Sequence, residues 1–271
     1  MKIEDSGGSM IDYTQGTGKQ YHIGLAKGDV GRYVILTGDP KRCEKIANHF
    51  DNPIKVADNR EYTTYTGYVE GYKMSVTSTG IGGPSASIAI EELVNIGADT
   101  FIRVGTCGGI DLDVIGGDIV IANSSIRMEG TTREYVSIEF PAVANIDITN
   151  ALIYTSKTLG YRYHVGTVQS KDSFYGEHQP ELHPAEDKLK SKWKEWIRMG
   201  TLASEMETAS LFIVGAYRKV RVGACLLCLA NQERELHNMT NKQFHDTDLI
   251  INLAVKSMLK IAEDDNKNNK K

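Results

Sequence analysis

The sequence predicts an α/β fold. Apolar segments with the composition of β-strands alternate along the chain with segments of helical periodicity, which is typical of a sheet covered by helices. The chain has 271 residues, 41% of them hydrophobic, which is enough for a substantial core in one large domain or two small ones. No tandem repeat or long linker divides it.

The strands are predicted from short apolar runs. They are expected at 33–36, 101–104, 118–122, 165–168 and 222–229. The last run is continuously apolar, as in a strand that is buried on both faces. It contains Cys225 and Cys228, whose spacing is formally that of a metal or redox motif. Because residues three apart in a strand point to opposite faces, we favour a structural role for both cysteines.

The helices are predicted from apolar residues at helical spacing. They are expected at 40–50, 84–96, 148–159, 187–199, 205–219 and 240–263. Asp39 is a suitable N-cap for the first, with Pro40 at the first helical position. Gly97 and Gly160 are placed to end two others. Polar tails are expected at 1–18 and 264–271, because they contain little that could pack.

Composition and charge argue against several classes of protein. The net charge is -4 and no basic stripe stands out, so nucleic acid is not an expected partner. The N-terminal residues are polar and lack the apolar run of a signal peptide or membrane span, so we expect a cytoplasmic protein without a membrane partner. Four cysteines without disulfide-framework spacing fit that compartment.

Two glycine-rich segments with an arginine between them indicate an anion site. They are Thr79-Gly80-Ile81-Gly82-Gly83-Pro84-Ser85 and Arg103-Val104-Gly105-Thr106-Cys107-Gly108-Gly109. Glycines let the backbone approach a ligand, and the guanidinium of Arg103 can donate two hydrogen bonds to a phosphate. Glycines that only form tight turns between strands and helices are the alternative for either cluster taken alone.

A third segment, Gly38-Asp39-Pro40 followed by Arg42, points to the same chemistry. The free amides and the dipole of a helix N-terminus favour an anion, and a cation in the first turn does not stabilise the helix. An anion held between Gly38, Arg42 and Arg103 would remove this conflict. A solvated arginine is the simpler alternative.

Several cofactor and catalytic motifs are missing. The glycine clusters do not match the dinucleotide fingerprint, because Ser85 stands where its third glycine should be. The chain also lacks the phosphate-binding loop of ATPases and the nucleophile elbow of serine hydrolases. Binding of NAD or ATP and serine-hydrolase chemistry are therefore not supported.

The motifs together resemble those of the nucleoside phosphorylase-I family, and the similarity runs from about Tyr21 to about Leu259. The segments that carry the resemblance are Gly38-Asp39-Pro40-x-Arg42, Asn59-Arg60-Glu61-Tyr62-Thr63-Thr64, Ser78-Thr79-Gly80-Ile81-Gly82-Gly83-Pro84-Ser85, Arg103-x-Gly105-Thr106 and Glu205-Met206-Glu207. The uridine branch, rather than the purine branch, is favoured by Glu139-Phe140-Pro141-Ala142-Val143-Ala144 and Asp172-Ser173-Phe174-Tyr175.

The resemblance implies a single domain at 19–263 with a mixed, partly barrel-like central sheet flanked by helices. It implies a homodimer or a ring of dimers that cleaves uridine with phosphate, giving uracil and ribose 1-phosphate. Phosphate is a co-substrate in this reaction, and no metal or organic cofactor is required. In some members a monovalent cation such as K⁺ lies at the dimer interface, at the positions of Glu61, Ile81 and Ser85.

The resemblance also implies roles for individual residues. Phosphate would be held by Gly38, Arg42, Arg103 and Thr106, joined by Arg60 of the partner subunit. Arg42, Arg103 and Thr106 would contribute most to catalysis. Ribose would be held by Met206 and Glu207, with His22 of the partner subunit reaching the 5′ hydroxyl. The base would contact Cys107, Gly108, Phe174, Gln179, Leu229 and Gln232.

The segments that read the base depart from the family pattern. The family has a glutamine and an arginine in the loop after the Phe-Tyr pair, but residues 174–183 contain no arginine. A second arginine of the family is replaced by Gln232, unless Arg234 bends in. Each lost charged hydrogen bond costs about 1.5–3 kcal/mol, and a carboxylate of Glu177 or Glu181 near the base would repel a developing anion.

These departures leave alternatives open. One is a relative that binds phosphate or a nucleoside without catalysis. Another is an altered base preference. A purine phosphorylase is less favoured, because Asn231 stands in the region where those enzymes use an aspartate. Hydrolysis by water is less favoured again, since it needs no phosphate-binding arginines.

Overall fold

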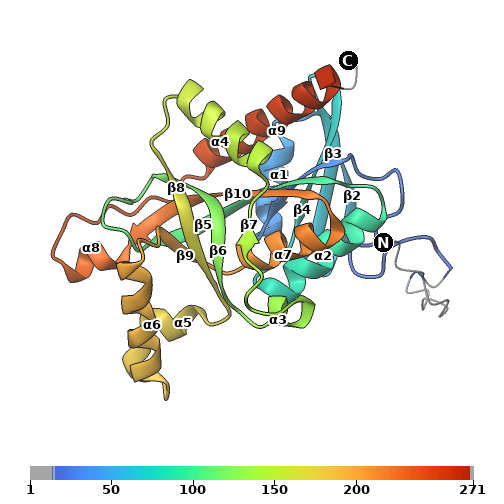
Figure 1. Cartoon of the computed structure of the whole chain (residues 1–271). Helices are drawn as coiled ribbons and strands as arrows, with labels where there is room; N and C mark the ends of the chain where they lie inside the picture. The colour runs from blue at the N-terminus through green and yellow to red at the C-terminus, as the bar shows by residue number, and fades with distance from the viewer. Residues whose placement is uncertain (1–13, 15, 269–271) are drawn as a thin grey trace.

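The computed structural model describes residue 14 and residues 16–268 and shows a mixed sheet with helices on both faces (Figure 1). The strands are β1 Tyr33–Thr37, β2 Asp51–Asn59, β3 Tyr62–Val69, β4 Tyr72–Ser78, β5 Thr100–Gly109, β6 Ile119–Met128, β7 Ala142–Val143, β8 Tyr163–Lys171, β9 Ala203–Glu205 and β10 Arg221–Asn231. The helices are α1 Pro40–Ala47, α2 Gly83–Asn95, α3 Thr131–Tyr135, α4 Ile146–Thr158, α5 Phe174–His178, α6 Glu186–Arg198, α7 Thr208–Arg218, α8 Gln232–Leu236 and α9 Asp248–Asn268, with a 3₁₀ turn at Pro180–Leu182.

The sheet is partly closed, as the resemblance implies. Its strand order over the described residues is β10-β6-β8-β9-β5-β1-β4-β3-β2, with β7 beside β6. A further pairing of β10 with β5 closes the strands β10, β6, β8, β9 and β5 into a ring. Strands β4, β1, β5 and β10 run parallel, so their carboxyl ends share one edge. In open α/β sheets ligands bind outside such an edge.

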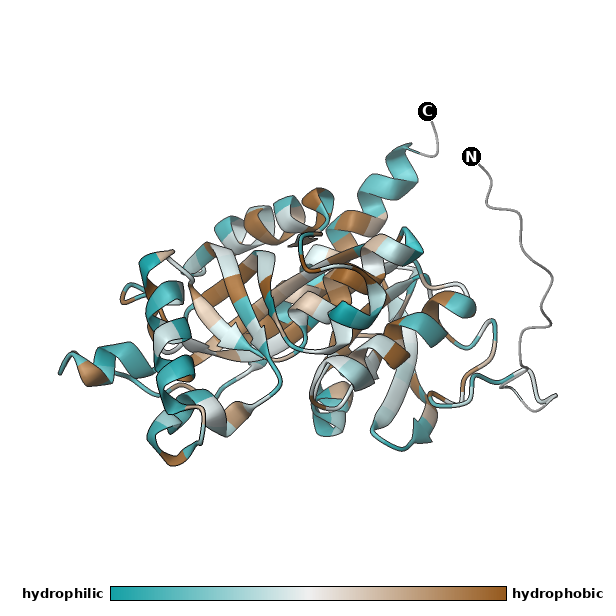
Figure 2. Cartoon of the chain, turned by 60° about the horizontal axis from the view of Figure 1, so that its bottom comes forward, coloured by the Kyte–Doolittle hydropathy of each residue, from teal (hydrophilic) through white to brown (hydrophobic). Residues whose placement is uncertain are grey.

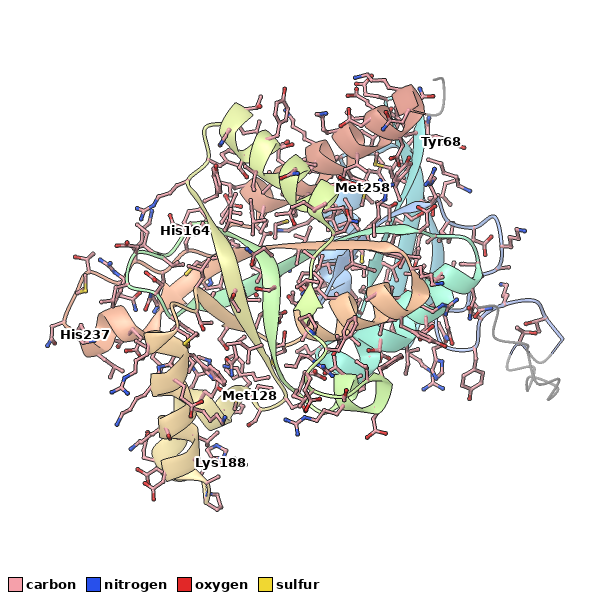
Figure 3. All side chains as sticks on the ribbon, viewed as in Figure 1. Tyr68, Met128, His164, Lys188, His237 and Met258 are labelled. Atoms are coloured by element: carbon pink, nitrogen blue, oxygen red, sulfur yellow. The ribbon has the colours of Figure 1, made fainter. Side chains whose placement is uncertain are left out.

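Two hydrophobic cores lie on the two faces of the sheet. One lies against α2 and α7, and the other against α1, α4 and α9. Alternate strand residues supply them: Val34 and Leu36 enter the first, and Tyr33 and Ile35 the second. Met258, labelled on α9 in Figure 3, is fully buried in the second core. Figure 2 shows the hydrophobic residues concentrated on the central strands and on the helix sides that face them.

The two cysteines of β10 occupy different cores. Cys225 packs with the α4 and α9 side, and Cys228 with the α2 and α7 side. The expected orientation toward opposite faces is therefore confirmed, and both thiols are free and buried. Among the described residues, no group of three or more histidine, cysteine, aspartate or glutamate side chains is arranged to hold a metal.

Several boundaries differ from those predicted. The helix expected at 205–219 begins at Thr208, because Glu205 belongs to β9. Helix α9 begins at Asp248 and continues to Asn268, beyond the expected end at 263. Asp265 on its last turns accepts a hydrogen bond of 3.0 Å from the Tyr33 hydroxyl, which anchors this end to β1. Residues 1–13 and 15 of the expected N-terminal tail, and residues 269–271, lie outside the described residues.

The segment α5 to α6 forms an arm that stands away from the sheet (Figure 1). Helix α6 has no fully buried residue, and Figure 3 shows its Lys188 far from the central strands. No helix in the described part of the chain combines the length and apolar character needed to cross a bilayer.

Candidate active site

A cavity of about 880 Å³ opens at the carboxyl ends of the parallel strands and continues toward the arm. It is lined by Gly38, Asp39, Pro40, Arg42, Gly80, Ile81, Arg103, Gly105, Thr106, Cys107, Gly108, Gly109, Lys171, Phe174, His178, Trp193, Ser204, Glu205, Met206, Glu207, Leu229, Ala230, Gln232, Glu235, Asn241 and Gln243. The three segments that predicted an anion site thus meet in one place.

Arg103 lies at the floor of this cavity and is 4% exposed. Its Nε donates to Glu205 Oε2 at 3.3 Å, and its Nη2 donates to Glu207 Oε2. Nη1 is buried and has no hydrogen-bond partner. Burial lowers the pKa of Arg103, but the carboxylates of Glu207 and Glu205 outweigh it and raise the pKa. Arg103 therefore stays charged, with one donor group unused.

Gly105 has a steric role beside this arginine. A Cβ at Gly105 would lie 2.8 Å from Leu226 Cδ2 and 3.1 Å from Arg103 Nη2. A side chain at this position would therefore force the Leu226 methyl group or the Arg103 guanidinium to shift. The glycine of the Arg103-x-Gly105 motif is therefore explained by the space that the guanidinium occupies.

Glu205 and Glu207 have distinct tasks because they do not lie on one helix. Glu205 ends β9, and its carboxylate accepts the backbone N–H of Glu207 at 2.9 Å and that of Thr208 at 2.9 Å. It thereby satisfies the first amides of α7. Glu207 Oε1 accepts the Gly82 N–H at 2.7 Å, which joins the first glycine segment to this site. Burial, the largest cause, raises the pKa of Glu207 against the opposing effect of Arg103.

Arg42 approaches the same cavity from α1. Asp39 caps this helix by accepting the Lys41 N–H at 2.9 Å, as predicted from the sequence. The Arg42 guanidinium donates from Nη1 to Thr37 Oγ1 at 3.3 Å. Burial lowers the pKa of Arg42, and the positive charge of Arg103 acts in the same direction. Two guanidinium groups that destabilise each other would be relieved by an anion between them.

The predicted ribose and base residues are divided between the cavity and the rest of the structure. The ribose residues Met206 and Glu207 and the base residues Cys107, Gly108, Phe174, Leu229 and Gln232 line the cavity, as does the predicted phosphate residue Thr106. Gln179 is not among its lining residues, because α5 ends one residue earlier and presents His178 there. Cys107 is 5% exposed, which agrees with a packing role.

The end of the cavity near the arm, which we call the base end, is formed by Lys171, Phe174, His178 and Gln232. The rings of Phe174 and His178 lie 4.5 Å apart, and His178 Nδ1 is 2.9 Å from Gln232 Oε1. Burial, followed by the charge of Lys171, lowers the pKa of His178. The imidazole is therefore neutral near pH 7 and donates from Nδ1, which leaves Nε2 as an acceptor.

Lys171 lines the cavity, although the sequence analysis did not single it out. The Glu177 carboxylate, which would repel an anionic base if it were unpaired beside it, is paired instead. The Lys171 ammonium lies 3.0 Å from Glu177 Oε2, with both side chains buried. Gln169 Nε2 donates to the other carboxylate oxygen at 2.5 Å. Glu177 is thus neutralised within the wall. The sequence feature that could have identified Lys171 is its position directly before the Asp172-Ser173-Phe174-Tyr175 segment.

The residues after β10 take structural roles. Arg234 donates from Nε to the Thr240 carbonyl at 2.7 Å and from Nη1 to the Leu112 carbonyl at 2.5 Å, so it does not bend into the cavity. Asn231 caps α8 and donates to the Asp111 carbonyl at 2.7 Å. Gln232 is therefore the side chain that occupies the place expected for the second arginine.

His22 and Arg60 lie outside this cavity but share a surface. His22 Nδ1 is 2.6 Å from Glu92 Oε1, and the Asn59 side chain donates to the His22 carbonyl at 2.7 Å. Tyr21 lies between them, with its ring 4.9 Å from that of His22 and 5.4 Å from the Arg60 guanidinium carbon. Neither residue is therefore among those that line the cavity of its own subunit.

Glu61 and Ser85, two of the three residues expected at the cation position, are in contact. Ser85 Oγ donates to Glu61 Oε1 at 2.7 Å, and this hydrogen bond is the largest cause that lowers the pKa of Glu61. The Ile81 side chain is 76% exposed on the adjacent loop. A carboxylate, a hydroxyl and nearby backbone carbonyls are oxygen donors that suit a hard cation.

Matches to known proteins identify the class that this fold and site define. The model of the phosphorylase superfamily matches residues 32–263, and the chain belongs to that family. A uridine phosphorylase from Treponema pallidum (strain Nichols) is 51% identical over 246 residues, covering 90% of this chain and 95% of the relative. The family resemblance read from the motifs is confirmed.

Two further matches bear on fold and substrate. The crystal structure of uridine phosphorylase from Vibrio fischeri ES114 matches with a TM-score of 0.78 and 32% identity, covering 91% of this chain and 99% of that chain. A guanosine phosphorylase from Halorubrum lacusprofundi is 38% identical over 206 residues, covering 76% of this chain and 81% of the relative. The similar proteins thus include one named as a uridine phosphorylase and one named as a guanosine phosphorylase.

Proposed function

We propose that this protein cleaves uridine, or a related pyrimidine nucleoside, with inorganic phosphate and releases the free base and ribose 1-phosphate. The observation that carries the proposal is the unpartnered, buried Nη1 of Arg103 in a cavity that Arg42 also lines. The name of the Treponema pallidum relative supports uridine as the nucleoside.

The chain's residues suit each part of this reaction. Arg42, Arg103 and Thr106 hold the phosphate dianion, with the amide of Gly38 at the helix N-terminus. Glu207 accepts the ribose hydroxyls beside Met206. As the bond between sugar and base lengthens, the sugar becomes cationic, and the bound dianion stabilises it and attacks C1′. Much of the rate then comes from positioning and preorganised charge.

The active unit is a homodimer or larger ring in which two subunits complete each site. Arg60 of the partner subunit adds a third guanidinium to the phosphate, and His22 of the partner subunit reaches the 5′ hydroxyl. Their common surface around Tyr21 supports this arrangement, since one approaching subunit would present both together.

A monovalent cation such as K⁺ is proposed at Glu61, Ser85 and the carbonyl of Ile81. It would stabilise the dimer rather than take part in bond cleavage, since phosphorolysis needs only phosphate as co-substrate. Activity and dimer stability compared in K⁺ and in a bulky organic cation test this role. Equal stability in both would contradict it.

The test of the function is release of free base from a panel of nucleosides, with and without phosphate. Phosphate-dependent cleavage of uridine or another pyrimidine nucleoside is the expected result. Cleavage without phosphate would indicate a hydrolase, and preferred cleavage of guanosine would move the protein to the purine side. Binding of nucleoside without any cleavage would establish the catalytically silent alternative.

A further inference from the structure

The base end of the cavity contains a buried cation whose donors are not all used. Lys171 is the last residue of β8, its side chain is 5% exposed, and it lines the cavity. An ammonium has three N–H donors. Among the described residues, Nζ donates a hydrogen bond to Glu177, and it lies 5.9 Å from the centre of the Phe174 ring.

Glu177 keeps this ammonium balanced without blocking it. The carboxylate is buried, accepts from Gln169 at 2.5 Å and from Lys171 at 3.0 Å, and is not itself a lining residue. The pair as a whole is neutral while the substrate is neutral. Negative charge that develops in the cavity is nearer to the Lys171 ammonium than to the Glu177 carboxylate, because Lys171 lines the cavity and Glu177 does not.

Lys171 is the charged donor of the base end. The lining residues that are lysine or arginine are Arg42, Arg103 and Lys171, and the first two belong to the phosphate end. His178 and Gln232 are neutral and hydrogen-bonded to each other. The two arginines expected from the family pattern are absent, so Lys171 is the side chain that can take over their electrostatic task.

We propose that Lys171 is a catalytic residue that donates a hydrogen bond to a carbonyl oxygen of the leaving pyrimidine. This inference rests on the proposed phosphorolysis. The C1′–N1 bond breaks with its electron pair going to the base, and a phosphate oxygen forms the new bond to C1′. The base anion takes up the proton that HPO₄²⁻ gives up, so uracil and the ribose 1-phosphate dianion result.

A leaving-group comparison tests this role. We expect Lys171→Met to lower kcat/KM for uridine roughly ten- to a hundred-fold, as for loss of one charged hydrogen bond. The loss should be several-fold smaller for 5-fluorouridine, because fluorine withdraws electrons and already stabilises the departing anion. The KM for phosphate should not change. Lys190→Met, which removes an exposed lysine of the same arm, is the matched control.

A second variant separates catalysis from folding. Lys171→Met alone leaves the Glu177 carboxylate buried and unpaired, which destabilises a protein strongly. The double variant Lys171→Met with Glu177→Gln removes both charges and keeps side-chain volume. We expect it to fold and to show the same difference between uridine and 5-fluorouridine.

The outcomes are distinct. Equal losses on the two nucleosides, or no loss, in the folded double variant would overturn the role of Lys171 and leave phosphorolysis standing. Failure of the unsubstituted protein to release free base from any pyrimidine nucleoside in the presence of phosphate would overturn the proposed function, and this inference with it. A larger loss on uridine in both variants supports the assignment.

Discussion

Arg103 Nε lies 3.3 Å from Glu205 Oε2, and this contact joins the phosphate end of the cavity to the start of α7. The same carboxylate accepts backbone amides of Glu207 and Thr208. One buried carboxylate thus fixes both the arginine and the N-terminus of α7, directly after Glu207. Correct folding of the β9–α7 connection and correct placement of the phosphate arginine are therefore coupled.

Glu205→Gln is expected to destabilise the protein by about 3–5 kcal/mol, since it leaves Arg103 with an incompletely paired buried charge. Urea unfolding followed by circular dichroism measures this. Glu195→Gln, on the exposed face of α6, serves as the control and should change stability by less than about 1 kcal/mol. Equal stability of the Glu205 variant and the parent would contradict the coupling.

Arg42→Ala is expected to weaken the use of phosphate with little change in stability. Its hydrogen bond to Thr37 is long, at 3.3 Å, so folding loses little. Loss of a charged donor should lower kcat/KM for phosphate about ten- to a hundred-fold. Initial rates at varied phosphate, together with a melting curve, check both parts. Arg198→Ala, an exposed site on α6, should leave both unchanged.

Mixing two variants, each weakened in its use of phosphate, tests the shared site at low phosphate concentration. In a mixed dimer of Arg60→Ala and Arg42→Ala chains, one site receives both intact arginines and the other receives neither. Random reassortment should restore about a quarter of the parental activity. Each variant taken through the same procedure alone is the control. If the mixture is no more active than its components, Arg60 does not act across the interface.

His178 is expected to make stability depend on pH. Its pKa in the folded protein is lowered, first by burial and then by Lys171, whereas an unfolded histidine titrates at about 6.5. Below that value the unfolded chain binds a proton that the folded protein does not, so the free energy of unfolding decreases as the pH falls toward the folded pKa. It is regained above about 6.5. His178→Gln should lack this component, and parallel profiles of parent and variant would contradict it.

The phosphate end could be predicted from the sequence because its signals are local. Glycine segments, an N-cap followed by proline, and the arginine beside Gly105 each specify a backbone shape or a charge within a few residues. Strands such as β3, by contrast, are rich in tyrosine and threonine and lack an apolar run. Their pairing in the sheet decides their state, and this is not visible locally.

The base end could not be predicted because its contacts are distant in sequence. His178 and Gln232 come together from α5 and from the residue after β10. Alignment of residues 174–183 with the family pattern predicted Gln179 in the site. The short helix α5 ends at His178, and this histidine lines the cavity instead. Similarly, the sequence predicted that Glu205 and Glu207 lie on one helix. The pairing of β9 with β5 and β8 places Glu205 at the end of a strand instead.

The arm from α5 to α6 contributes Phe174, His178 and Trp193 to the cavity wall while α6 has no fully buried residue. Exchange of this segment should disturb the rest of the molecule little, provided that the buried Glu177 carboxylate, which pairs with Lys171 of β8, is retained. Transplanting the corresponding stretch from a relative with another nucleoside preference would thus offer a route to retarget the enzyme, with the catalytic apparatus for the sugar and the attacking oxyanion carried over intact.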